Sequence, residues 1–419
     1  MRHNRTSPPA FRFSLTIALL LAIAYLLPDA PASAPEKSSP SAAVRTMTGL
    51  EVFESMSSDP LRLKHIGIIT DQTGVDPQGH RTIDIFARRR NSTLVAIFSP
   101  EHGITGHADS TVANTTDAQT GVPIFSLYGK TRRPTDAMLK GIDVLVFDIQ
   151  DAGVRFYTYV TTMAYCMEAA ARHHISFIVF DRPDPLGGEV IEGPVLDCDR
   201  LSFTGYFPMP LRYGMTLGEL ARMFNEENKI GADLHVFRMR NWSRSETYDQ
   251  TGLVWIPPSP NLRTVEEAFL YPGVEILQAA GISVGRGTDT PFEILGAPWI
   301  HAAELAGELN RRRIPGLRFS PIQFTPREGL YTGQLCAGIR IQITNRIAFK
   351  SMRMGLEIAD SLYRLYPQDF PLAKINELVG SKRTIERLER GDSPAAIVVG
   401  WSSDLDTFRA MRAKYLLYR

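Results

Sequence analysis

Short apolar runs that end in polar residues recur along the first half of the chain. The run from Leu94 to Phe98 stops near Pro100, and Glu101 and His102 follow directly. An apolar run of this length, ended by a proline, predicts a strand buried on both faces of a sheet. The pattern therefore places a carboxylate and an imidazole just beyond the carboxyl end of a strand.

Three further apolar runs end in the same way. If the four strands are parallel, their polar tips lie on one edge of the sheet, where open α/β sheets bind ligands. The alternative for Glu101 and His102 is a pair of turn residues exposed to water. The three further runs are residues 64–70 before Asp71, residues 144–149 before Gln150 and Asp151, and residues 177–180 before Asp181.

Helical patterns alternate with these runs. The sequence predicts short helices over 82–90 and 134–140 and a longer helix over 158–173. Thr216 with Glu219, and Thr264 with Glu267, have the spacing of capping boxes that begin helices. This alternation predicts an α/β fold with a Rossmann-like, doubly wound and mostly parallel sheet over residues 45–298.

The pattern changes beyond Pro298. A strand with one polar face is predicted over 338–344, and amphipathic helices are predicted over 301–312, 349–366 and 405–418. We expect residues 299–419 to form a smaller α+β auxiliary domain. A cleft between two such domains is a natural place for a substrate site.

The N-terminus has the pattern of a secretory signal peptide. Arg2, Arg5 and Arg12 precede an apolar stretch over 13–27, and Ala32-Ser33-Ala34 supplies a cleavage site. The alternative is an uncleaved N-terminal anchor. We expect residues 1–34 to be removed and residues 35–44 to be a linker, giving an exported chain, periplasmic or extracellular, without stable membrane insertion.

Charge and cysteine content exclude some classes of partner and fold. Without residues 1–34 the chain has 43 basic and 44 acidic residues, so nothing indicates a nucleic-acid or other polyanion partner. The three cysteines allow at most one disulfide, so disulfides do not define the fold. Cys166 falls in a helical pattern and is expected to be a small buried apolar residue.

No cofactor is expected. No G-x-G-x-x-G follows the first strand, and Gly129-Lys130-Thr131 lacks the upstream glycine of a phosphate-binding loop. Glu101, His102, His107 and Asp109 offer metal-binding atoms within nine residues, but their spacing matches no strong metal signature. We predict no metal and keep a metal-dependent hydrolase as an alternative.

Carboxylates at the strand ends favour glycoside hydrolysis, which uses one protonated acid and a second group that acts at the sugar carbon. Glu101, Asp151, Asp181 and Glu192 all follow predicted strand ends or turns, and their spacing does not decide which two act. Asp181, like Asp148, lies nearer the strand body and is more typical of a structural residue than Glu101.

Two arginines are candidates for binding an anionic sugar. Arg155 lies among Phe156, Tyr157 and Tyr159, a combination of cation and flat rings that suits an anionic, carbohydrate-like ligand. The alternative is a structural Arg155 paired with Asp151. Arg286 lies between two glycines, which would let a ligand approach the backbone or would simply form a turn.

Seven motifs in order resemble those of the NamZ-type exo-β-N-acetylmuramidases. The resemblance runs from about Gly49 to the C-terminus. The motifs are Ser-Pro-Glu-His-Gly (99–103), Asp-Ile-Gln-Asp-Ala-Gly-Val-Arg-Phe-Tyr-Thr-Tyr (148–159), Asp-Arg-Pro-Asp-Pro-Leu-Gly-Gly (181–188), Glu-Gly-Pro (192–194), Tyr-Gly-Met-Thr-Leu-Gly-Glu-Leu-Ala (213–221), Pro-Pro-Ser-Pro-Asn-Leu (257–262) and Gly-Arg-Gly-Thr (285–288).

The resemblance implies a Rossmann-like catalytic domain, a smaller auxiliary domain and an active site between them. It implies an exo-acting glycoside hydrolase that releases terminal N-acetylmuramic acid from the non-reducing ends of peptidoglycan fragments. The substrate would be a peptidoglycan-derived muropeptide or disaccharide. Glu101 would be the catalytic acid, and Glu192 is a carboxylate candidate only.

We therefore predict a set of site residues on one sheet edge. A non-enzymatic solute- or glycan-binding protein that uses the same two domains is the alternative from another class. The predicted catalytic residues are Glu101, Asp151 and Glu192, and the predicted substrate-binding residues are His102, Gln150, Arg155, Tyr157, Asp181 and Arg286.

Overall fold

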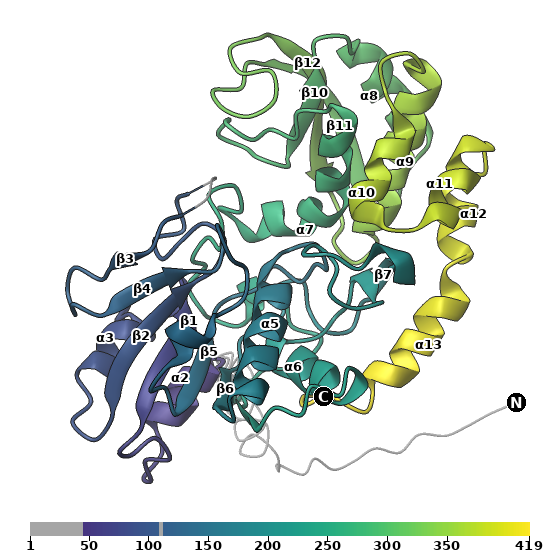
Figure 1. Ribbon diagram of the computed structural model, residues 1–419. Helices are drawn as coiled ribbons and strands as arrows, with labels where there is room; N and C mark the ends of the chain where they lie inside the picture. The colour runs from purple at the N-terminus through teal and green to yellow at the C-terminus, as the bar shows by residue number, and fades with distance from the viewer. Residues whose placement is uncertain (1–44, 109–111) are drawn as a thin grey trace, which may run out of the picture. The chain divides into compact units, whose positions relative to one another are not determined.

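The computed structural model describes residues 45–108 and 112–419, and residues 45–419 cluster as one structural unit (Figure 1). The predicted signal peptide and linker, and Asp109, lie outside the described residues. The central sheet has seven strands: β1 (His65–Thr70), β2 (Thr93–Ser99), β3 (Thr115–Thr116), β4 (Pro123–Ser126), β5 (Val144–Asp148), β6 (Ser176–Phe180) and β9 (Leu234–Phe237).

The strand order of this sheet is β3-β4-β2-β1-β5-β6-β9. All neighbours pair in parallel except β3 and β4. Counted in chain order, the six parallel strands have the order 3-2-1-4-5-6 of the dinucleotide-binding fold. The order reverses between β1 and β5, so the loops after these two strands border the place where such sheets bind ligands. The predicted doubly wound sheet is confirmed.

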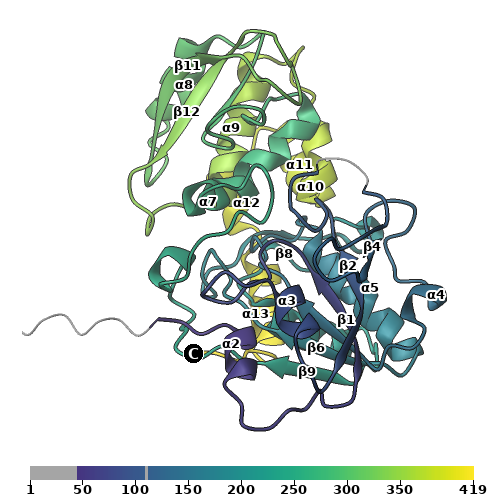
Figure 2. The same ribbon diagram turned by 90° about the vertical axis from the view of Figure 1, so that its left-hand side faces the viewer.

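Alternate residues of the central strands enter two cores, one on each face of the sheet. Val144 and Val146 of β5 belong to one core, and Leu145 and Phe147 to the other. α2 and α3 pack on the first face and α5 and α6 on the second (Figures 1 and 2). The helices are α2 (Gly49–Glu54), α3 (Thr82–Ala87), α4 (Asp136–Leu139), α5 (Tyr159–Arg172) and α6 (Leu217–Glu227).

A second, smaller sheet is antiparallel, with the order β10-β12-β11. α8 packs on β11 and β12 and also contacts α9. The smaller second domain with its own sheet is therefore confirmed. These elements are β10 (Ile294–Ala297), α8 (Ala302–Arg311), β11 (Leu317–Phe324), β12 (Cys336–Ile343) and α9 (Ser351–Leu365).

Helix α7 (Val265–Val274) packs closely against α9. The two helices meet at Gly273 and Gly355, where a Cβ added to Gly355 would lie 2.4 Å from the Gly273 carbonyl oxygen. Any larger residue at this crossing would push the helices apart. Thr264 and Glu267 form the predicted capping box at the start of α7.

The C-terminal segment runs back to the first sheet. The helix predicted over 405–418 is observed as α13 (Ser402–Arg412), and it ends early because the last residues bond to other parts of the chain. The Leu417 N–H donates to Glu219 Oε1 at 2.8 Å, and the Arg244 N–H donates to the Arg419 carbonyl at 2.9 Å. The remaining elements are β7 (Glu192–Val195), β8 (Pro210–Arg212), α10 (Asn376–Val379), α11 (Lys382–Glu389) and α12 (Pro394–Val399).

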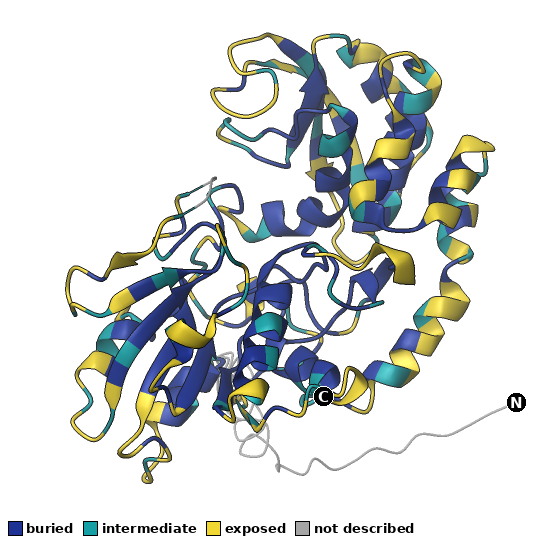
Figure 3. Cartoon of the chain, in the orientation of Figure 1, coloured by how far each residue is buried: buried dark blue, intermediate teal, exposed yellow. Residues whose placement is uncertain are grey.

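The central strands and α5 are the most deeply buried elements, whereas α13 is largely exposed (Figure 3). Cys166, Cys198 and Cys336 are free thiols, and Cys166 is buried as expected. Among the described residues, no helix is both long enough and apolar enough to cross a membrane.

Candidate active site

Glu101 lies directly beyond β2, and the start of α5 holds it. The Thr158 hydroxyl donates to Glu101 Oε2 at 2.5 Å, and the Tyr159 hydroxyl donates to the Glu101 carbonyl at 3.3 Å. Short hydrogen bonds to a carboxylate are among the stronger kinds. Within residues 45–108 and 112–419, Oε1 accepts no hydrogen bond. One carboxyl oxygen is therefore fixed and the other is available to a substrate.

The turn that carries Glu101 has a constrained backbone. His102 has a φ of 69°, in the left-handed region that a non-glycine residue rarely adopts. Its Nδ1 donates to the Ala108 carbonyl at 2.7 Å, which closes the loop. This hydrogen bond favours a role for His102 in shaping the loop. No group of three or more metal-binding side chains occurs among the described residues.

A row of aromatic rings extends from Glu101 toward Arg286. Tyr157 lies 4.6 Å from Tyr159 and 6.1 Å from Tyr271, measured between ring centroids. Tyr271 in turn lies 4.8 Å from Phe292. Edge-to-face pairs at these separations are favourable. Tyr157 is therefore buried among other aromatic rings and is not exposed to solvent.

Tyr271 is the meeting point of the candidate charged residues. Burial raises its pKa well above the ordinary value, the negative charge of Glu275 raises it further, and Arg286 opposes the shift. The charges of Glu101 and Asp151 also act on the same hydroxyl. Tyr271, which sequence reasoning missed, therefore lies within range of the charges of Glu275, Arg286, Glu101 and Asp151.

Arg286 is held at a partly exposed position. Its Nη2 donates to Glu275 Oε1 at 2.8 Å and its Nε donates to Gln278 Oε1 at 2.9 Å. Its guanidinium lies 5.3 Å from the centre of the Phe292 ring. A Cβ at the neighbouring Gly287 would lie 2.3 Å from the backbone of Glu328, so only glycine fits there. Gly287 therefore allows the Glu328 backbone to pack closely here and also adopts the positive φ of a turn.

Asp151 is a buried acid next to a second one. The Gly153 N–H donates to Asp151 Oδ2 at 2.9 Å, and the Tyr213 hydroxyl donates to the same oxygen. Burial raises the pKa of Asp151 to about 6. Burial also raises the pKa of Asp184 to about 7, and Arg212 partly offsets that rise. Acids of this kind can carry a proton near neutral pH.

Both terminal nitrogens of Arg155 donate to backbone carbonyls, and the residue is 1% exposed. Burial lowers its pKa to about 9. The structure supports neither the predicted carboxylate clamp nor the alternative pair with Asp151. The side chain instead ties distant segments together by donating to the carbonyls of Pro194 (3.2 Å), Met209, Leu378 and Val379 (2.9 Å each).

Glu192 also has structural partners. Arg212 donates to Glu192 Oε1 at 3.1 Å, and the Met352 N–H donates to Oε2 at 3.1 Å. The carboxylate therefore joins the β7–β8 hairpin to the start of α9. Neither contact is shared with Glu101, so this geometry does not favour Glu192 as the second catalytic group.

Asp181 anchors the start of α6 and the C-terminal segment. Its oxygens accept from the Thr216 hydroxyl at 2.7 Å, the Gly218 N–H at 2.8 Å and the Tyr418 hydroxyl at 2.6 Å. Burial raises its pKa to about 7. With its acceptors filled and no exposed surface, Asp181 is placed as a structural residue and not as a substrate ligand.

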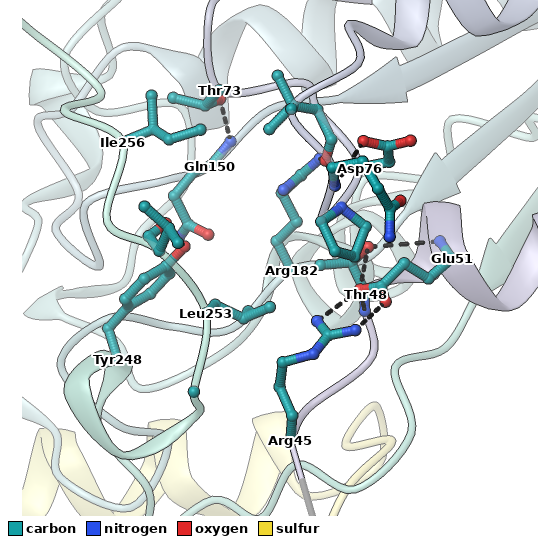
Figure 4. Close-up of a pocket in the computed structure, with 16 residues that line it drawn as sticks. Arg45, Thr48, Glu51, Thr73, Asp76, Gln150, Arg182, Tyr248, Leu253 and Ile256 are labelled. Atoms are coloured by element: carbon teal, nitrogen blue, oxygen red, sulfur yellow. Dashed lines mark hydrogen bonds and ion pairs between the residues drawn. The ribbon is translucent and has the colours of Figure 1, made fainter.

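Gln150 lies in a pocket of about 430 Å³ whose lining does not include Glu101 (Figure 4). Thr73 after β1, Gln150 after β5 and Arg182 after β6 border this pocket. It therefore opens where the strand order reverses. Gln150, predicted as part of one site with Glu101, instead faces this second space.

Sequence reasoning missed Thr158, Tyr271 and Glu275. Thr158 stood within a recognised motif, beside Tyr157 and Tyr159, and a hydroxyl at a helix start was the available signal. Tyr271 and Glu275 lie in an apolar helical segment without a motif of their own. Their role depends on how α7 packs, which no local pattern gives.

Two family models match the chain over most of its length. The model described as exo-beta-N-acetylmuramidase NamZ, N-terminal, matches residues 66–266, and the C-terminal model of the same family matches residues 269–418. The chain belongs to the NamZ exo-β-N-acetylmuramidase family. The two models meet at the start of α7, whereas the sequence pattern placed the domain boundary at residue 298.

A curated protein and two solved structures are also similar to this chain over at least 90% of its length. The chain is 42% identical over 394 residues to a Bacillus subtilis protein named peptidoglycan beta-N-acetylmuramidase NamZ, covering 93% of this chain and 95% of that one. Two crystal structures of DUF1343 family proteins from Bacteroides fragilis also match. One has a TM-score of 0.83 at 39% identity and the other 0.72 at 31% identity, each covering 90% of this chain and 99% of the other.

Proposed function

We propose that the chain is an exo-acting glycoside hydrolase that releases terminal N-acetylmuramic acid from the non-reducing ends of peptidoglycan fragments. The observation that carries the proposal is Glu101, held by Thr158 at the carboxyl edge of a Rossmann-like sheet. The 42% identity to the Bacillus subtilis peptidoglycan beta-N-acetylmuramidase supports the reaction class.

Glu101 is the proposed general acid. Oε2 is bonded to Thr158, so a proton on Oε1 can pass to the glycosidic oxygen as the bond to the leaving sugar breaks. Asp151 is the second carboxyl near Tyr271, and we propose that it stabilises the positive charge that develops on the sugar. Arg286, which also pairs with Glu275, is the proposed cation for the lactyl carboxylate.

The direct test is incubation with N-acetylmuramyl-N-acetylglucosamine and mass detection of free N-acetylmuramic acid. Release by the wild-type protein and little release by Glu101→Gln would support the proposal. Binding of the disaccharide without any cleavage would support the alternative of a glycan-binding protein. Activity that is lost in excess chelator and restored by zinc would support a metal-dependent hydrolase instead.

We also propose that the chain is exported and acts on peptidoglycan in the periplasm or outside the cell. The support is the order of three segments before residue 35: basic residues, then an apolar stretch, then Ala32-Ser33-Ala34. N-terminal sequencing of protein recovered from outside the cytoplasm should begin at Pro35. Recovery of the full-length chain from the membrane fraction would contradict this and favour an N-terminal anchor.

A further inference from the structure

We propose that the pocket where the strand order reverses binds a neutral amido sugar, of the N-acetylglucosamine type, as a second carbohydrate site beside the one at Glu101. The pocket, called the switch pocket here, has a volume of about 430 Å³, within the range of small-molecule sites. That the sugar comes from peptidoglycan rests on the proposed function, whereas the preference for a neutral sugar rests on the pocket itself.

The floor of the switch pocket holds a buried oxygen without a donor. Gln150 Nε2 donates to the Asp151 carbonyl at 3.0 Å and to the Pro183 carbonyl at 2.8 Å, which fixes the orientation of the amide. The Oε1 atom then has no hydrogen-bond partner in the described part of the chain, although Gln150 is only 2% exposed. A buried acceptor of this kind normally receives a hydroxyl or N–H group.

A guanidinium, that of Arg182, also lines the switch pocket. Arg182 Nε donates to Asp148 Oδ1 at 2.6 Å, and Nη2 donates to the Val75 carbonyl at 3.1 Å. Its third nitrogen, Nη1, makes no hydrogen bond to residues 45–108 or 112–419. Figure 4 shows Arg182 between the Gln150 side and the Arg45 side of the pocket. The floor thus offers one acceptor and one donor to the same ligand.

The positive charges around the switch pocket are already matched. Arg182 pairs with Asp148, and Arg45 pairs with Glu51. An anion would find no unmatched positive charge here, and a cation would lie beside these two guanidinium groups. A neutral ligand with adjacent hydroxyl groups fits better, because each hydroxyl can both donate to Gln150 and accept from Arg182.

Part of the lining of the switch pocket is apolar, on the same side as Gln150. Tyr248, Leu253 and Ile256 lie on one side of it (Figure 4), and Val254 at its edge is 79% exposed. Sugar rings present C–H faces, and an acetamido group adds a methyl, so a polar floor against an apolar wall matches an amido sugar.

One segment connects the switch pocket to Glu101. Gly252, Leu253, Val254 and Ile256 line the pocket, and the next two residues are Pro257 and Pro258. The Pro257 carbonyl accepts from Gln72 Nε2 at 2.7 Å, and the Pro258 carbonyl accepts from Tyr159 at 2.8 Å. The same Tyr159 hydroxyl reaches the Glu101 carbonyl. A sugar in the switch pocket therefore contacts the segment that braces the catalytic loop.

The test measures N-acetylglucosamine binding to the full chain by calorimetry, and to two variants. Leu253→Trp fills the pocket, and Leu335→Trp, at a leucine that is 60% exposed and outside the pocket, is the matched control. We expect wild type and Leu335→Trp to bind alike, with a Kd of about 1 mM, and Leu253→Trp to bind at least about tenfold more weakly. Circular dichroism and thermal unfolding establish that both variants fold.

Equal affinity in all three proteins, or no binding to wild type, would overturn the switch-pocket proposal. So would displacement of the sugar by inorganic phosphate, because it would mark the pocket as an anion site. Disaccharide cleavage is followed in parallel, and Leu253→Trp should still cleave. A wild-type enzyme that cleaves but does not bind the sugar there contradicts only this inference, whereas a wild type that binds but does not cleave contradicts the proposed function.

Discussion

At the scale of single residues, the Thr158 hydroxyl positions Glu101 for its proposed role. Thr158 bonds Oε2 at 2.5 Å and leaves Oε1 without a hydrogen bond from the described residues. The two carboxyl oxygens therefore differ, and Oε1 is the one that can carry the proton of a general acid. Asp151 is instead buried and accepts from the Tyr213 hydroxyl and the Gly153 N–H, so the two carboxyl groups have different partners.

Glu101→Gln should lower kcat about 10²- to 10⁴-fold on an unactivated disaccharide. The amide keeps the size of the side chain and can accept from Thr158, but it has no proton to donate. A substrate with a good aryl leaving group needs less acid assistance, so the loss on that substrate should be smaller. Turnover of the disaccharide near the wild-type rate would rule out Glu101 as the acid.

Arg286→Met and Arg155→Met should have different effects. Losing the Arg286 charge should lower kcat/KM for a muramic-acid substrate about 10- to 150-fold, with a smaller loss on the glucosamine analogue, which lacks the lactyl carboxylate. Arg155→Met should instead lower stability by about 1–3 kcal/mol for each buried carbonyl left without a donor. Kinetics on both substrates and urea unfolding separate the two roles. Equal losses on both substrates for Arg286→Met would disprove the clamp.

At the scale of elements, the parts with strong local patterns could be predicted. β1, β2, β5 and β6 are short apolar runs, and the capping boxes at Thr216 and Thr264 are local sequence signals, so all of them are where the sequence predicts them. The β7–β8 hairpin lacks such a pattern.

The site residues also divide into those that a local sequence pattern predicts and those that it does not. Glu101 could be predicted from a strand end and a motif. The partners of Arg155 could not be predicted, because Leu378 and Val379 lie more than two hundred positions away in the sequence. Tyr271 likewise reaches the site only through the packing of α7. Side chains whose partners are set by tertiary contacts are not visible to local patterns.

Thr216→Ala should reduce the free energy of unfolding by about 1–2 kcal/mol, because it removes the cap of α6 and a hydrogen bond to Asp181. Thr216→Ser retains the hydroxyl and serves as the matched control. Urea unfolding followed by circular dichroism measures both. If alanine and serine variants were equally stable, the cap would contribute nothing.

At the scale of the whole molecule, the C-terminal segment is bonded to residues around the start of α6. Tyr418 donates to Asp181, Leu417 donates to Glu219, and Arg412 donates to the Gly214 carbonyl at 2.5 Å. These contacts join the C-terminal segment to the start of α6, on the first sheet. The auxiliary part therefore returns to the Rossmann-like part through its last residues. The join is built around a buried carboxyl, Asp181, which makes it sensitive to pH.

Stability should fall as pH rises from about 4 to about 7. Burial raises the pKa of Asp71 and Asp151 to about 6 and of Asp181 and Asp184 to about 7. An aspartate in the unfolded chain has a pKa of about 3.9, so in this window the native state binds more protons than the unfolded state. The free energy of unfolding then decreases with pH, by up to about 1.4 kcal/mol per pH unit for each proton of difference.

Asp181→Asn tests this dependence at the C-terminal join, because the amide cannot ionise. Its unfolding free energy should decline less steeply than that of the wild type between about pH 5 and pH 7. Asp199→Asn, at an exposed aspartate, provides the control and should leave the slope unchanged. Urea unfolding at several pH values measures all three slopes. Identical slopes for wild type and Asp181→Asn would mean that Asp181 is ionised in the fold, held by Thr216, Gly218 and Tyr418 despite its burial.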